Sequence, residues 1–479
     1  MTKIAKSTAL PKEGNIILLG TAKTVWQKFG LSLQEAEYAK KRFADPERKC
    51  VAINRLGSYV FVQQIDKKAQ QYQTIEECRR AGSVIVASLN AAEAKDVTIY
   101  DIEGKGAEAL ALAEGIVLAN YQFIHHRSDV EKKKHSLTAV NIYSKKITSR
   151  DAELLQIVVD STCKARDLIN EPLNHLSAVQ LGKAIEAMGK ETGCKTEVFN
   201  KAKIEALKMG GLLSVNRGSM DPPTFSIIEW KPSNAKNKKP YVLVGKGVVY
   251  DTGGLSLKPT PNSMDQMKCD MSGAAAVSCA VYAIAKAKLP VHVVALVPAT
   301  DNRPGENAYV PGDIITMYSG KTVEMLNADA EGRMILADAL HYAKSYNPEL
   351  VMDFATLTGA AATAIGSFGA VCMGNADERT KNKLKASANN VYERLAEFPF
   401  WEEYDELIKS EIADMKNVGG PQGGAITAGK FLANYVNYPW MHFDIAGPAF
   451  LTGKDHYRVK GGTGVGVRFL FDFFRNLQK

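Results

Sequence analysis

The feature that most constrains the fold is an alternation of strand-like and helical segments along the whole chain. Runs of β-forming residues are followed by stretches in which apolar residues recur at helical spacing. Several of the later strand-like runs lack polar alternation, which is typical of strands covered on both faces. The alternation predicts an α/β fold with a central sheet that is mostly parallel or mixed. The clearest strand-like runs are Asn15–Gly20, Tyr59–Val62, Val97–Tyr100, Val291–Val297, Leu350–Phe354 and Met441–Ile445.

The length of the chain, 479 residues, predicts more than one domain. A candidate helix begins at Ser149, with Ser149 or Asp151 as its N-cap, and ends near Pro172. We interpret this helix as a connector. The prediction is therefore a smaller N-terminal α/β domain over residues 1–148, a connecting helix over residues 149–170, and a larger C-terminal α/β domain over residues 171–479.

The formal net charge of +8 is confined to the first third of the chain. Residues 1–150 hold 24 Lys and Arg against 16 Asp and Glu, whereas the remaining residues hold 36 of each. A basic domain can attract nucleic acid. Here the basic residues form short groups without interleaved aromatic residues, such as Lys40–Arg42 and Lys132–Lys134. This pattern favours a solvated surface, with nucleic-acid binding as the alternative.

The sequence predicts neither a membrane span nor a secretory signal. No stretch reaches the roughly 18 consecutive apolar residues that a spanning helix needs, and Met1–Leu10 lacks the apolar core of a signal peptide. Seven cysteines without a C-x-x-C pair indicate reduced thiols, so we expect a cytoplasmic protein. Neither a complete P-loop nor a nucleophile elbow nor an H-E-x-x-H motif occurs.

Two segments combine acidic residues, lysine or arginine, and glycine beside apolar runs: Val244–Ala276 and Asn327–Arg333. Ligands of α/β sheets bind at the carboxyl ends of strands, where both segments are expected to lie. In the first segment, Gly245 and Gly247 flank Lys246, and we expect a sharp turn and a close backbone approach there. Asp251, Lys258 and Asp270 follow.

The second segment reads Asn-Ala-Asp-Ala-Glu-Gly-Arg. If it is extended, Asp329, Glu331 and Arg333 share one side, because alternate residues point the same way. The alternative is the acidic first turn of a helix. With Asp251 and Asp270, these carboxylates supply four negative charges that two divalent cations would balance. Oxygen ligands suit Mg²⁺ and Mn²⁺, and Zn²⁺ also accepts them.

The sequence resembles the leucyl (cytosol) aminopeptidases, a family of dinuclear-metal exopeptidases. The resemblance covers the chain from about Ala165 to the C-terminus. It lies in Ala165–Asn174, Val244–Pro259, Met267–Val277, Asn327–Arg333, Thr356–Ala360 and His442–Ala449. It implies that residues 171–479 form a catalytic metallopeptidase domain. It also implies removal of N-terminal residues from peptides, with leucine and other apolar residues favoured, by a homohexamer.

The resemblance also implies roles for individual residues. Two metal ions per subunit are expected, Mn²⁺ or Zn²⁺, with Mg²⁺ and Co²⁺ as alternatives. The implied ligands of the tighter site are Lys246, Asp251, Asp270 and Glu331, and those of the more exchangeable site are Asp251, Asp329 and Glu331. Lys258 would stabilise the oxyanion, and Arg333 would hold a bicarbonate ion that takes a proton from the metal-bridging water. The implied substrate-binding residues are Met267, Thr356, Leu357, Gly359 and Ala446.

The chain departs from the family pattern at three positions. Ala328 replaces the usual Thr, Ser272 the usual Gly, and Tyr250 the usual Phe. None of the three is an implied metal ligand, so the expected reaction class is unchanged.

Overall fold

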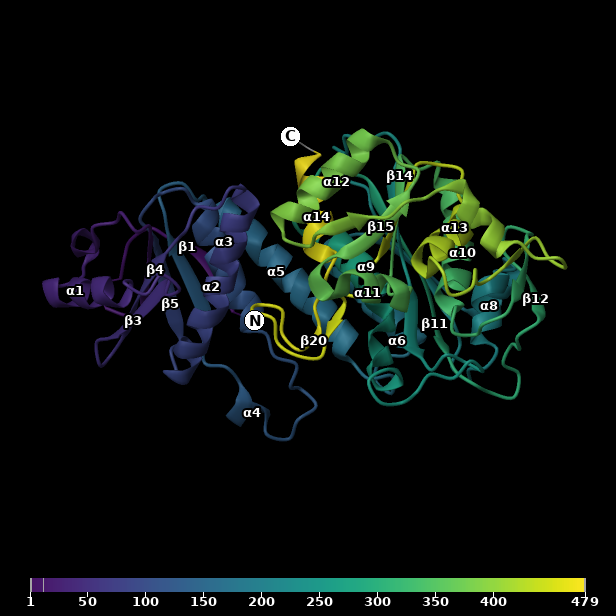
Figure 1. Cartoon of the computed structure of the whole chain (residues 1–479), viewed down its shortest axis with the longest axis horizontal. Coiled ribbons are helices and arrows are strands. Elements are labelled where there is room, and N and C mark those ends of the chain that lie inside the picture. Colours follow the sequence, from purple (N-terminus) through teal and green to yellow (C-terminus); the bar gives the residue numbers. More distant parts are fainter. Residues whose placement is uncertain (1, 12, 478–479) are drawn as a thin grey trace. The chain divides into compact units, whose positions relative to one another are not determined.

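A computed structural model describes residues 2–11 and 13–477. The chain divides into two compact units (Figure 1). The first unit extends to Cys163 and also contains Gly453–Lys460, and the second comprises Lys164–Thr452 and the chain from Gly461 onward. The division falls within helix α5 (Ser149–Asn170). The sequence analysis did not predict that Gly453–Lys460 groups with the first unit.

The first unit is built on a six-stranded sheet of order β1-β6-β5-β2-β4-β3. All neighbouring strands are parallel except β3, which is antiparallel to β4. The strands are β1 (Lys3–Ser7), β2 (Ile16–Gly20), β3 (Cys50–Asn54), β4 (Tyr59–Gln64), β5 (Asp96–Asp101) and β6 (Ala139–Tyr143). The helices are α1 (Leu33–Arg42), α2 (Gln71–Ala91), α3 (Ala107–Ala119) and the short α4 (Val130–Lys133).

Helices α2 and α3 of the first unit approach each other closely. A Cβ atom at Gly115 would lie 2.0 Å from the backbone oxygen of Arg79, so only glycine fits there. Beside this crossing, buried Arg79 pairs with Glu114 at 2.6 Å and with Glu76 at 3.4 Å. Tyr457, from Gly453–Lys460, donates a hydrogen bond to Glu76 at 3.0 Å.

The second unit contains a nine-stranded mixed sheet of order β16-β15-β18-β14-β9-β11-β8-β7, with β10 paired to β11. Strands β18, β14, β9 and β11 are mutually parallel, so their carboxyl ends meet at one edge. These strands are β18 (Trp440–Asp444), β14 (Leu350–Ala355), β9 (Tyr241–Gly245) and β11 (Val293–Asn302). The outer strands are β7 (Lys195–Phe199), β8 (Thr224–Trp230), β10 (Gly247–Asp251), β15 (Ala370–Gly374) and β16 (Leu395–Glu397).

Helices cover both faces of this sheet. On one face, α9 (Ser272–Lys286) packs with α6 (Ala178–Thr192) and α14 (Val467–Asn476). On the other face, α10 (Glu331–Ala343) packs with α8 (Gly210–Asn216) and α13 (Gly424–Ala433). Strand β9 is fully buried apart from Tyr241 at its start. This burial explains why its sequence lacks polar alternation. The remaining helices of this unit are α7 (Lys201–Ala206), α11 (Gly359–Ile365) and α12 (Glu378–Asn390).

Two smaller sheets complete the second unit. Strands β12 (Asp313–Thr316), β13 (Thr322–Met325) and β17 (Met415–Lys416) form one, and β19 (Phe450–Leu451) and β20 (Gly461–Gly462) form the other. The α/β fold class predicted from the alternation is confirmed. None of the described helices is both long and apolar enough to cross a membrane.

One local prediction is wrong, and one pair of alternatives is resolved. The chain does not turn sharply at Gly245 and Gly247, because β9 ends at the first and β10 begins at the second. These glycines serve close packing instead, since a Cβ at Gly245 would lie 2.6 Å from the backbone oxygen of Gly273. For the second acidic segment, the structure has the helical alternative and not the extended one. Glu331 is the first residue of α10, as the helical alternative proposed.

Candidate functional site

Lys246 and the predicted acidic residues lie at the edge where the parallel strands of the second unit end. Lys246 follows β9, and Asp251 ends β10. Asp270 lies in a short 3₁₀ helix, η2 (Met264–Met271), and Glu331 opens α10. All four side chains are buried. Carboxyl ends of parallel strands are where α/β proteins bind ligands.

Two lysines hold the carboxylates together. The Nζ of Lys246 lies 2.8 Å from Asp270 Oδ2 and 2.9 Å from Glu331 Oε1, and it donates to the backbone oxygen of Thr356 at 2.9 Å. Lys258 is half-buried. Its Nζ lies 3.0 Å from Asp251 Oδ2 and also contacts Asp329 Oδ1.

Three of the carboxylates are close enough to share a cation. Asp251, Asp329 and Glu331 each offer one oxygen, and these oxygens lie within 4.8 Å of one another. Asp270 joins the group through Lys246. The structure therefore brings together all five residues that the sequence analysis proposed as metal ligands.

The cluster carries more negative charge than its lysines balance. Burial raises the pKa of Asp329 to about 7, and repulsion by Asp251 and Glu331 adds to the rise. Burial also raises the pKa of Asp270 and of Glu331. For Lys246, burial alone would lower the pKa, but attraction by Asp270, Glu331 and Asp251 outweighs it and the pKa is raised. Like charges this close raise one another's pKa unless a cation lies between them.

The donor set fits divalent cations. Glu331 Oε2 is buried and has no hydrogen-bond partner among the described residues. Burying an unpaired carboxylate oxygen costs free energy that a cation would recover. Carboxylates with a nitrogen donor match the ligand preferences of Mn²⁺ and Zn²⁺.

Two asparagines that the sequence analysis missed support the cluster. Asn302, at the end of β11, donates through Nδ2 to Asp251 Oδ1 at 2.8 Å and to the backbone oxygen of Ala328 at 3.0 Å. It thus joins the two acidic segments. Its position at the end of a buried apolar run was the signal that could have identified it.

The second asparagine, Asn417, fixes the backbone before the acidic residues of the second segment. Its Oδ1 accepts from the N–H of Leu326 at 2.9 Å, and its Nδ2 donates to the backbone oxygen of Asn327 at 2.8 Å. Its own backbone oxygen accepts from Arg333 Nη1 at 2.7 Å. Nothing in the local sequence marks Asn417.

Arg333 is buried near the cluster. Burial lowers its pKa to about 10, against the opposing attraction of Glu331 and Asp444. The guanidinium therefore stays protonated at neutral pH. Its Nε has no hydrogen-bond partner among the described residues, so part of its donor set is available for an anion.

The five predicted substrate-binding residues lie around this edge. Thr356 donates through Oγ1 to Asp270 Oδ1 at 2.8 Å, and the N–H groups of Leu357 and Ala446 both donate to Asp444 Oδ1 at 3.1 Å. Met267 lies in η2, three residues before Asp270. Gly359 is exposed and is the first residue of α11 (Gly359–Ile365).

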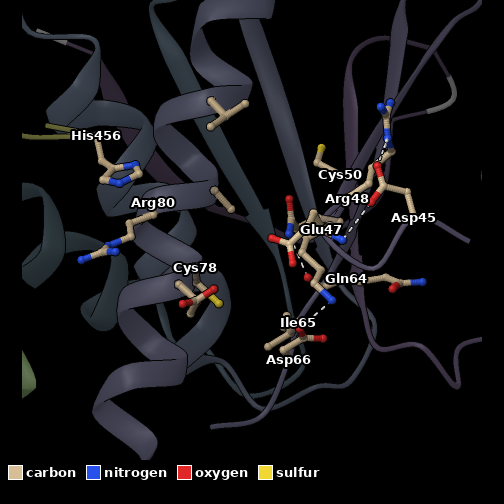
Figure 2. Close-up of a pocket in the computed structure, with 15 residues that line it drawn as sticks. Asp45, Glu47, Arg48, Cys50, Gln64, Ile65, Asp66, Cys78, Arg80 and His456 are labelled. Atoms are coloured by element: carbon tan, nitrogen blue, oxygen red, sulfur yellow. Dashed lines mark hydrogen bonds and ion pairs between the residues drawn. The ribbon is translucent and has the colours of Figure 1, made fainter. Parts of the chain in front are cut away.

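A separate cavity of about 560 Å³ lies in the first unit at the carboxyl end of β4 (Figure 2). Two ion pairs lie in its lining, Lys49 with Asp66 at 2.7 Å and Arg48 with Asp45 at 3.9 Å. Burial raises the pKa of Cys78 to about 12, so this thiol is neutral. The lining contains Arg48, Lys49 and Arg80 beside four acidic residues, so its charge is closer to balance than that of the cluster in the second unit.

Comparisons with known proteins agree with the position of the cluster. Residues 163–471 match the model of the cytosol aminopeptidase family, catalytic domain. A probable cytosol aminopeptidase of Chloroherpeton thalassium is 50% identical over 330 residues, which are 68% of this chain and 64% of that protein. One of Chlorobium phaeobacteroides is 46% identical over 385 residues, 78% of this chain and 75% of that protein. The match to the first relative spans slightly less than two thirds of its length.

Solved structures extend the likeness to nearly the whole chain. The bottromycin maturation enzyme BotP in complex with Mn has a TM-score of 0.85 at 29% identity, covering 98% of this chain and 100% of that one. A mutant of tomato leucine aminopeptidase has a TM-score of 0.86 at 27% identity, covering 99% of this chain and 97% of that one.

Proposed function

The chain belongs to the cytosol aminopeptidase family, and on this premise we propose that it is a metal-dependent aminopeptidase. Its substrates would be peptides, from which it removes N-terminal residues, with leucine and other apolar residues favoured. The observation that carries this proposal is the buried carboxylate cluster with its unpaired Glu331 oxygen. The cluster falls inside the segment that matches the family's catalytic domain.

Two divalent cations are proposed cofactors. Lys246, Asp251, Asp270 and Glu331 would hold one, and Asp251, Asp329 and Glu331 the other. Bound there, such ions would activate water and polarise a carbonyl group. Mn²⁺ is supported by the BotP structure, which contains it, and Zn²⁺ is the other expected ion.

Lys258 and Arg333 would carry the remaining steps. Lys258 is half-buried at the edge of the cluster, and its ammonium can stabilise the negative charge that develops on the scissile carbonyl oxygen. Arg333 cannot act as a base because it stays protonated. Its available Nε–H suits a planar anion, and bicarbonate held there would accept the proton from the attacking water.

The strand-end loops would form the substrate pocket. Thr356, Leu357 and Ala446 are tied to Asp270 or Asp444 by hydrogen bonds, so these parts of the wall are held in place before substrate arrives. A preformed wall reduces the entropy lost on binding. Met267 and Gly359 are proposed to complete the pocket.

The experiment that tests the proposal is hydrolysis of leucyl, alanyl and aspartyl amides and short peptides by the purified chain. The protein would be chelated, its metal removal verified, and Mn²⁺, Zn²⁺, Co²⁺ or Mg²⁺ added back. We expect hydrolysis only at the N-terminus, loss of activity on chelation and recovery with at least one of these ions. Full activity in verified metal-free protein would refute the metal-dependent mechanism.

Assembly and location are further parts of the proposal. By family analogy the chain would form a homohexamer, which light scattering would report as about six times 52.2 kDa. A cytoplasmic location is supported by the seven cysteines, which form no C-x-x-C pair.

A further inference from the structure

Asp444 occupies a central place at the strand ends of the second unit. It is the last residue of β18 and pairs in register with Ala355, the last residue of the parallel neighbour β14. The side chain is 1% exposed. A carboxylate buried this deeply needs hydrogen-bond donors to offset its lost hydration.

The donors all come from the two loops that follow β14 and β18. Asp444 Oδ1 accepts from the N–H of Leu357 and from the N–H of Ala446, both at 3.1 Å. Asp444 Oδ2 accepts from Thr358 Oγ1 at 2.6 Å. Thr358 Oγ1 in turn accepts from the N–H of Ala361 at 3.0 Å and caps α11. One carboxylate therefore joins both loops and the start of a helix.

We propose that Asp444 is a positioning residue that sets the selectivity of the site for the substrate's N-terminal side chain, an inference that rests on the proposed aminopeptidase function. It acts by fixing Leu357, Thr358 and Ala446, which form or adjoin the proposed pocket wall. Hydrogen bonds to a charged acceptor are stronger than neutral ones, so three of them hold the two loops firmly.

The loop after β14 is anchored at two points with different tasks. Thr356 is bound to the acidic cluster, through Asp270 and through Lys246. The next two residues, Leu357 and Thr358, are bound to Asp444. Loss of Asp444 would remove the hydrogen bonds that hold Leu357 and Thr358. The hydrogen bonds of Thr356 and the packing of Leu357 against the apolar core would remain. The pocket wall would then move while the carboxylate cluster keeps its own contacts, because Asp444 accepts hydrogen bonds from Leu357, Thr358 and Ala446, none of which is a proposed metal ligand.

A set of matched variants tests this division. Asp444→Ala removes all three acceptors. Asp444→Asn keeps an oxygen for the two backbone N–H groups and offers an amide N–H to Thr358. The control is Asp338→Ala, because Asp338 is also 1% exposed and also accepts from two backbone N–H groups, of Leu212 and Tyr318, both at 2.9 Å. Those two residues lie outside the proposed pocket.

Kinetics on leucyl and alanyl substrates, with metal content measured on the same samples, provide the readout. For Asp444→Ala we expect KM for the leucyl substrate to rise about tenfold, with a smaller fall in kcat. The leucyl-to-alanyl ratio of kcat/KM should fall by a similar factor, with metal content unchanged. Asp444→Asn should stay within about threefold of wild type. Asp338→Ala should lower thermal stability and leave the ratio unchanged.

Each outcome decides the inference. An unchanged ratio and KM in folded Asp444→Ala would overturn it while leaving the proposed function intact. If Asp444→Ala does not fold, Thr358→Val removes the Thr358 hydrogen bond to Asp444 together with the cap on the N–H of Ala361, and it must lower the ratio in the same direction for the inference to stand. A wild-type chain without peptidase activity would overturn both the proposed function and this inference.

Discussion

Each unit of the molecule contains a buried charge cluster, and the two clusters differ in balance. In the first unit, Glu76 and Glu114 are paired with Arg79, and Arg80 adds a second contact to Glu76 at 3.1 Å. Two carboxylates thus meet two guanidinium groups. In the second unit, four carboxylates meet two lysines, and one oxygen of Glu331 remains without a hydrogen-bond partner among the described residues.

The charge balance distinguishes a structural cluster from a candidate metal site. A balanced buried network satisfies its own charges and has no need of an added ion. Carboxylates that have raised pKa values and keep an unpaired oxygen are stabilised by a cation, which the chain itself does not supply. Burial alone therefore does not indicate function, whereas several buried carboxylates gathered with too few cations indicate a metal site.

The largest expected effect comes from removing one carboxylate from each cluster. Asp251→Ala should lower kcat/KM by more than the 10- to 100-fold typical of residues that only orient a metal ligand, and metal content should fall. Glu114→Ala should instead lower the free energy of unfolding by about 3–5 kcal/mol, since it leaves Arg79 buried with less pairing. Activity assays, metal analysis and urea unfolding on both variants provide the test. Equal loss of metal in Glu114→Ala would remove the distinction between the clusters.

The two buried arginines, one in each unit, differ in how fully their donors are paired. Arg79 is bound by carboxylates on two sides, whereas Arg333 bonds a backbone oxygen and keeps Nε available. Arg333→Ala should keep the metal and lower turnover by about 10²–10³-fold, as for loss of a single contact in the transition state. Bicarbonate added to carbonate-depleted buffer should raise wild-type activity and leave the variant almost unchanged. If the variant responds to bicarbonate as the wild type does, Arg333 does not hold the base.

The smallest expected effect concerns Asp338, a buried carboxylate held by backbone N–H groups without a cation. Burial raises its pKa from 3.8 to about 7. The folded protein therefore keeps this proton to higher pH than the unfolded chain does, and stability from this group is lost as pH rises from about 4 to 7. Asp338→Asn should flatten that part of the curve of unfolding free energy against pH, measured by urea unfolding. A slope as steep as that of the wild type would show that Asp338 titrates normally.

Sequence reasoning reached the fold class and the composition of the cluster because both depend on local patterns. Apolar runs located the strands, and acidic residues beside them located the sheet edge. It missed Asn302, Asn417 and Asp444, because each is a single polar residue most of whose partners lie far away in sequence. Asn417, for example, contacts residues about 90 positions earlier.

The sequence also gave no sign that Gly453–Lys460 groups with the first unit. Tyr457 is only 4% exposed, and it is buried through contacts with residues nearly 400 positions away, including Glu76. Local propensity cannot report such packing. The predicted turn at Gly245 failed for a related reason, since glycine permits both a turn and a close contact, and the neighbouring α9 decides between them.

The carboxylate cluster in the second unit is proposed to hold two divalent cations. The most direct test is the metal content of the full chain, determined by elemental mass spectrometry after chelation, reconstitution and removal of free ions. We expect two ions per chain in the wild type and fewer in Asp251→Ala. A fully active wild-type protein that holds no divalent ion, or two ions retained by Asp251→Ala, would contradict it.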